Sequence, residues 1–71
     1  MNEAPWATIE ALMYELREYG LSQLRNPNCL RRLDMLSSNQ MRDVIRRLLG
    51  LRDCYPKVTD ELLIKLGDLL L

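Results

Sequence analysis

The sequence predicts an all-α protein, a compact bundle of four helices joined by short loops. Apolar residues recur every three or four positions in four segments, and residues that favour helix starts or ends separate these segments. The expected helices cover residues 5–19, 27–35, 38–52 and 60–71. A chain of 71 residues forms a single domain, residues 1–71. The expected core consists of Trp6, Ile9, Leu12, Met13, Leu16, Leu30, Leu33, Val44, Ile45, Leu48, Leu62, Leu66 and Leu69.

The first helix is predicted to begin at Pro5, because proline suits the first turn of a helix, where its missing N–H is not needed. Apolar residues at helical spacing follow it up to Leu16. Gly20 is expected to end the helix in a left-handed conformation. One further helical turn is expected over residues 21–24.

The second helix is expected to start at Asn26 and Pro27, which suit the N-cap and the first turn. Cys29 shares its apolar face with Leu30 and Leu33. A first-turn position near two arginines can lower the pKa of a thiol. Because Cys29 lies on the apolar stripe and has no base beside it, the sequence favours a buried structural cysteine.

The third helix has the clearest signals. Ser37 and Gln40 have the spacing of a capping box, in which each side chain satisfies a backbone N–H of the other residue. The apolar residues after this box define one face of the helix, and the other face carries Arg42, Asp43, Arg46 and Arg47.

The fourth helix follows Pro56, which cannot continue a helix, and Thr59, which suits an N-cap. Apolar residues occupy more than half of its circumference, and a chain this short has little other structure to cover them. This excess predicts a homodimer built on the fourth helix. Its interface is expected to contain Leu63, Ile64 and Leu70, with Leu66 and Leu69 facing inward.

The composition argues against catalysis and metal binding. The chain has no histidine, and its two cysteines form no Cys-x-x-Cys pair, so the commonest zinc patterns and all imidazole-dependent catalytic groups are missing. Its three glycines form no phosphate-binding loop. The sequence therefore predicts a protein that is not an enzyme and that uses no cofactor and no metal.

The sequence predicts an intracellular, cytoplasmic protein in a reducing compartment. Its first ten residues, MNEAPWATIE, lack the basic and apolar regions of a signal peptide. No apolar run approaches the roughly 18 residues that a spanning helix needs. A membrane-surface helix is the alternative use of the apolar fourth helix, but its polar strip lacks the cluster of lysine and arginine that favours one, so no membrane association is expected.

The formal net charge is zero, but the charges are unevenly distributed. Residues 1–24 carry four glutamates and one arginine, residues 25–52 carry seven arginines and two aspartates, and residues 53–71 carry four acids and two lysines. The candidate partner-binding residues are Arg31, Arg32, Arg42, Arg46 and Arg47. These arginines either contact an acidic partner or pair with the glutamates of the first helix, Glu10, Glu15 and Glu18.

The function that this pattern favours is docking on another protein. The alternative is a nucleic-acid-binding protein or transcriptional regulator of the helix-turn-helix type, because the second and third helices are joined by a tight connector. In that case Asn39 and Gln40 are candidate base readers and the arginines of the third helix contact DNA. The zero net charge and Asp43 among the arginines favour the protein partner.

In its size, its short helical design and its lack of any catalytic motif, the chain resembles the small helical proteins of phages and mobile elements, including anti-CRISPR inhibitors. The resemblance rests on these general features and on no shared motif. It implies an inhibitor that binds a host defence complex, which can contain nucleic acid, and that blocks DNA entry or nuclease recruitment.

Overall fold

The computed structural model describes residues 3–70 and confirms the all-α prediction: this part of the chain forms helices and no strand. The elements are α1 (Trp6–Tyr19), the 3-10 helix η1 (Gly20–Arg25), α2 (Pro27–Asp34), α3 (Ser38–Leu51) and α4 (Asp60–Asp68). The helical turn expected after Gly20 is η1. The helix α1 begins at Trp6, one residue later than predicted, and Pro5 is its N-cap residue. The helices α2 and α3 each end one residue earlier than predicted, α4 ends at Asp68, and residue 71 lies outside the described part.

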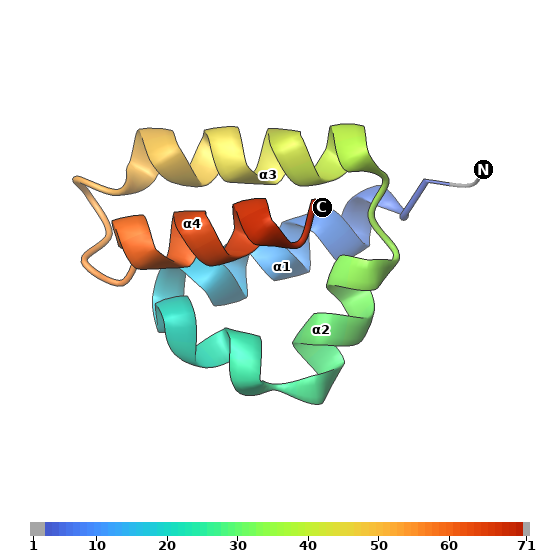
Figure 1. Ribbon diagram of the computed structural model, residues 1–71, viewed down its shortest axis with the longest axis horizontal. Coiled ribbons are helices and arrows are strands. Elements are labelled where there is room, and N and C mark those ends of the chain that lie inside the picture. The colour runs from blue at the N-terminus through green and yellow to red at the C-terminus, as the bar shows by residue number, and fades with distance from the viewer. Residues whose placement is uncertain (1–2, 71) are drawn as a thin grey trace.

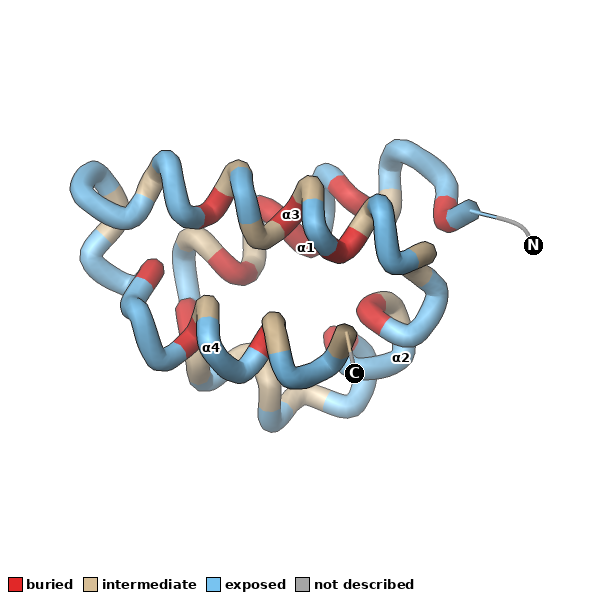
Figure 2. The backbone as a smooth tube through the Cα atoms, turned by 45° about the horizontal axis from the view of Figure 1, so that its top comes forward, coloured by how far each residue is buried: buried red, intermediate tan, exposed pale blue. Residues whose placement is uncertain are grey.

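The helices surround one core. In Figure 1, α3 runs along the top, α1 and α4 run beneath it, and η1 and α2 close the lower side. The helix α1 packs against η1, α2 and α3, whereas α4 packs against α3 and η1. Figure 2 shows the buried positions on the inward sides of the helices and the exposed positions on the outward sides.

Most of the predicted core is confirmed. Of the thirteen predicted residues, nine are buried: Ile9, Leu12, Met13, Leu16, Leu33, Val44, Leu48, Leu62 and Leu66. Ile45 is partly buried and packs against them. The buried set also contains Ala4, Cys29, Met41 and Val58. The prediction of a buried structural cysteine at position 29 is therefore confirmed.

Three core predictions are wrong, because Trp6, Leu30 and Leu69 are 59%, 38% and 49% exposed. Trp6 is the first residue of α1 and lies against an arginine side chain of α3 rather than in the core. Leu30 lies about 100° around α2 from Cys29, which with Leu33 defines the buried face. Leu69 follows the last residue of α4, at the periphery of the bundle.

Local side-chain caps start three of the helices as predicted. The side chains of Asn26, Ser37 and Thr59 accept hydrogen bonds from backbone N–H groups of α2, α3 and α4, and the capping box of Ser37 and Gln40 is complete. Gln40 does more than close this box. Its side chain also accepts a hydrogen bond from the backbone N–H of Ala4 and donates one to the carbonyl oxygen of Ala4, both at 3.0 Å. These bonds hold the segment before α1 against the start of α3.

Gly20 ends α1 with a positive φ of 62°, as predicted, but its ψ of −140° lies outside the left-handed helical region. The position also has a tertiary role. A Cβ atom at Gly20 would lie 2.3 Å from the carbonyl oxygen of Lys57, in the loop between α3 and α4. Gly20 therefore lets the start of η1 approach this loop more closely than any other residue type allows.

No helix within residues 3–70 is both long enough and apolar enough to cross a bilayer.

Candidate interaction surface

The five candidate arginines come from α2 and α3, and the two that form ion pairs with α1 contact different sides of it. Arg32 pairs with Glu15, whereas Arg47 pairs with Glu10. These two glutamates lie about 140° apart around α1, because each residue of a helix turns by about 100°. The arginines of α2 therefore do not extend the arginine face of α3.

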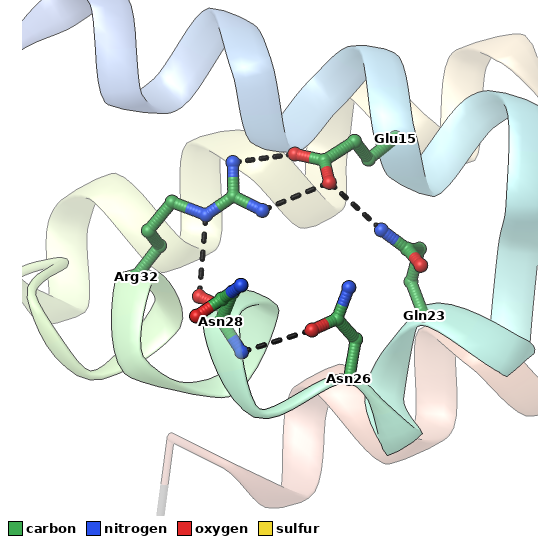
Figure 3. A network of polar contacts seen from close by, with 5 residues as sticks. All are labelled: Glu15, Gln23, Asn26, Asn28 and Arg32. Atoms are coloured by element: carbon green, nitrogen blue, oxygen red, sulfur yellow. Dashed lines mark hydrogen bonds and ion pairs between the residues drawn. The ribbon is translucent and has the colours of Figure 1, made fainter.

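Arg32 belongs to a polar network between α1, η1 and α2, shown in Figure 3. Its guanidinium contacts both carboxylate oxygens of Glu15, at 2.8 Å and 2.5 Å, and its Nε donates to the carbonyl oxygen of Asn28 at 3.2 Å. The side-chain amide of Gln23 donates to the same carboxylate at 2.9 Å. This bidentate geometry, with both charged side chains mostly covered, makes Arg32 a structural residue.

The charges in this network favour each other's ionised form. The hydrogen bond from Arg32, followed by its positive charge, lowers the pKa of Glu15 against the opposing effect of burial. The same hydrogen bond raises the pKa of Arg32. Nearby Arg31 is exposed and donates to the side chain of Asn28, so it also contributes to the structure of α2.

Arg47 is held on the side of α3 that faces α1. It lies 2.9 Å from Asp43 and 3.7 Å from Glu10, and its guanidinium is 4.9 Å from the centre of the Trp6 ring. Stacking of this kind contributes roughly 0.5–1 kcal/mol at an exposed site. The stacking explains why Trp6 stays at the surface: its ring faces a cation from the neighbouring helix.

Arg42 and Arg46 are the candidate residues that remain available. Both are exposed, and no carboxylate within residues 3–70 lies in ion-pair distance of either side chain. Leu49, which is 49% exposed, lies one helical turn further along. The three residues have the spacing i, i+4 and i+7, which places them on one face of α3. We call Arg42, Arg46 and Leu49 the α3 face.

A groove of about 400 Å³ borders the α3 face, between α1 and the second half of α3. Its charged wall consists of Arg17, Arg46, Arg47 and Glu10. Arg17 is not among the arginines predicted to bind a partner, because it is the lone arginine of an acidic helix. Its position in the groove depends on the packing of α1 against α3, which no local pattern reveals.

The three predicted dimer-interface residues differ in exposure. Leu63 and Leu70 are partly buried and pack against the monomer's own core, whereas Ile64 is 63% exposed. Because α4 packs against both α3 and η1, the bundle itself covers part of the apolar surface that was predicted to meet a second subunit, and it leaves Ile64 exposed. Self-association through Ile64 stays a prediction.

The described residues contain no cluster of histidine, cysteine or carboxylate side chains that suits a metal ion. Both cysteines are free thiols; Cys29 is buried and Cys54 is exposed. Burial raises the pKa of the Cys29 thiol despite the nearby charge of Arg32, so the first-turn position does not activate it. No family model, no curated protein and no solved structure matches the chain.

Proposed function

We propose that the chain is a small interaction module that docks, without catalysis, on an acidic protein surface through the α3 face. The observation that supports this proposal is the division of the arginines. Arg32 and Arg47 have carboxylate partners within the bundle, whereas Arg42 and Arg46 lie exposed on the helix side that faces away from the core. Guanidinium groups bind carboxylates in a bidentate manner, which suits them to an acidic partner.

The chemistry of the α3 face is that of a protein interface. Arginine is enriched in interfaces, and the exposed Leu49 adds apolar area beside the two charges. A rigid helix that is already capped and packed also loses little conformational entropy when it binds.

A protein partner fits the packing better than DNA does. In a helix-turn-helix unit, two consecutive helices pack as a pair and present the second to the major groove. Here the main neighbours of α2 are α1 and η1, and those of α3 are α1 and α4. The net charge of zero also gives little general attraction to a polyanion.

The resemblance to small helical proteins of phages, including anti-CRISPR inhibitors, suggests a more specific proposal: the acidic partner belongs to a host defence complex. The α3 face then covers an acidic surface of that complex and blocks access of DNA or of a nuclease. This more specific proposal is tested by adding the purified chain to a reconstituted defence complex and measuring DNA binding. It fails if the complex binds DNA equally well with and without the chain.

The docking proposal is tested with fluorescently labelled probes, a glutamate-rich peptide and a DNA duplex, whose binding is measured by anisotropy at low and high salt. The test variant combines Arg42→Glu with Arg46→Glu. The control combines Arg25→Glu with Lys65→Glu, which makes the same change in net charge at exposed positions outside the α3 face.

We expect the parent chain and the control to bind the peptide and the test variant to lose at least about tenfold in affinity, because two charge-assisted contacts become repulsive. An equal loss in both variants would show that only net charge matters. Tighter binding to the duplex, with an affinity that falls steeply with salt, would favour the nucleic-acid alternative.

A further inference from the structure

We propose that the groove between α1 and α3 is a binding site for one carboxylate side chain of the acidic partner, held between Arg17 and Arg46. The inference rests on the proposed docking function and names the contact that recognises the partner. The groove holds about 400 Å³, enough for a side chain rather than a whole folded element. It opens beside the α3 face, and Arg46 belongs to both surfaces.

Arg17 is positioned for a ligand that the bundle itself does not supply. Its guanidinium lies 5.3 Å from the centre of the Tyr55 ring, which fixes its orientation by stacking. Its Nε atom is buried and has no hydrogen-bond partner among the described residues. None of the carboxylates within residues 3–70 lies in ion-pair distance of Arg17. A stacked guanidinium in a groove, without its own counter-charge, is suited to an anion from outside.

The charges of the groove attract a small anion. Three arginines and one glutamate form the charged wall, which gives a formal charge of +2. Arg47 is already shared between Glu10 and Asp43, so Arg17 and Arg46 remain to bind the ligand. Glu10 offsets part of the positive charge on its side of the groove. The remaining charge attracts any small anion, so the apolar residues of the groove must decide between a carboxylate and a phosphate.

The floor of the groove adds a preference for an aliphatic neighbour. Leu51, which packs against the core, and the core residue Met13 both line the groove. A partner segment with a carboxylate side chain next to a leucine-like side chain therefore fits both the arginines and the apolar residues of the groove. Gly50 completes the wall, and a Cβ added there meets no atom within 4 Å. Because this position lines the groove and has room for a Cβ, it is the place to introduce a larger side chain as a test.

The test uses two capped tripeptides as probes, acetyl-Leu-Glu-Leu-amide and its neutral match acetyl-Leu-Gln-Leu-amide, together with inorganic phosphate. Binding is followed by NMR through the side-chain N–H signals of Arg17 and Arg46. Gly50→Leu fills the groove and favours the helix more than glycine does, so it keeps the fold while closing the site. Gly50→Ala is the control, because one methyl group leaves most of the groove open.

We expect the glutamate peptide, and not the glutamine peptide, to shift both arginine signals at millimolar concentration. Gly50→Leu should abolish this binding and raise the melting temperature, and Arg17→Gln should weaken binding about tenfold. Gly50→Ala and Arg42→Gln should keep it. Arg42 lies outside the groove, so these variants separate the two proposals.

Several results would overturn the groove proposal. If Gly50→Leu binds the peptide as well as Gly50→Ala does, the carboxylate does not enter the groove. If binding is lost in Arg42→Gln and kept in Arg17→Gln, docking on the α3 face survives and the groove proposal fails. Tighter binding of phosphate than of the glutamate peptide would exclude a site selective for carboxylates.

Discussion

Replacing Gly20 by alanine is expected to destabilise the bundle severely, although the change adds only one methyl group, at the buried junction of α1 and η1. Gly20 has a φ of +62°, and an alanine Cβ would lie 2.3 Å from the carbonyl oxygen of Lys57. A non-glycine residue in such a backbone conformation costs about 1–3 kcal/mol. Moving the Lys57 backbone away costs about 1–3 kcal/mol more, the usual range for overpacking.

The sum, about 2–6 kcal/mol, is large compared with the stability of a 71-residue domain, which is about 4–11 kcal/mol at roughly 0.05–0.15 kcal/mol per residue. Each kcal/mol corresponds to about 4–8 °C in the melting temperature of a domain of this size. Gly20→Ala should therefore lower the melting temperature by at least about 8 °C, measured by circular dichroism at 222 nm.

Gly50→Ala is the matched control, because it makes the same chemical change within α3, where a new Cβ meets nothing within 4 Å. It should stabilise the protein by about 0.5–1 kcal/mol, the usual difference between alanine and glycine inside a helix. If Gly20→Ala melts within a few degrees of the parent chain, Gly20 does not contact the Lys57 loop and the packing of η1 described above is wrong.

Three further predictions concern pH, thiol reactivity and self-association. Folding lowers the pKa of the Glu15 carboxyl below its ordinary value of 4.5. The ionised carboxylate therefore stabilises the folded state above pH 4.5, and this stabilisation is lost as the pH falls through the lower pKa of the folded state. Urea titrations should show that acid reduces the stability of Glu15→Gln less than that of the parent chain. Ellman's reagent should modify Cys54 at once and Cys29 only on unfolding, and rapid modification of both thiols in the native protein would contradict the buried position of Cys29. If the chain forms the predicted homodimer, Ile64→Lys should make it monomeric in analytical ultracentrifugation, whereas a parent chain that sediments as a monomer at high concentration would exclude the dimer.

The sequence was most informative where the structure is decided locally. The caps at Asn26, Ser37 and Thr59 depend on residues two or three positions away, so the chain near each helix start contains all the necessary information. The positive φ at Gly20 was predictable for the same reason. The approach of Lys57 to Gly20 was not, because these residues are far apart in the sequence.

The candidate site was predicted less well, because the role of each arginine depends on its tertiary neighbour. Periodicity placed Arg42, Arg46 and Arg47 on the polar side of α3, but it did not show that Arg47 faces Glu10 and the Trp6 ring. The apolar spacing of α1 also placed Trp6 in the core, whereas Trp6 is exposed at the start of the helix. The spacing of apolar residues in a helix predicts on which side of that helix a residue lies. It does not predict which neighbouring helix packs against that side.

Our central claim is that Arg32 stabilises the bundle, whereas Arg42 is free to bind a partner. It is tested most directly by comparing the thermal unfolding of Arg32→Gln and Arg42→Gln at neutral pH. Arg32→Gln should lower the melting temperature by about 4–16 °C, because losing the bidentate contact with partly buried Glu15 costs about 1–2 kcal/mol. Arg42→Gln should change stability by no more than about 0.5 kcal/mol, as surface substitutions usually do. An equal loss of stability in the two variants would show that Arg42 also supports the bundle, and would contradict its assignment to a docking surface.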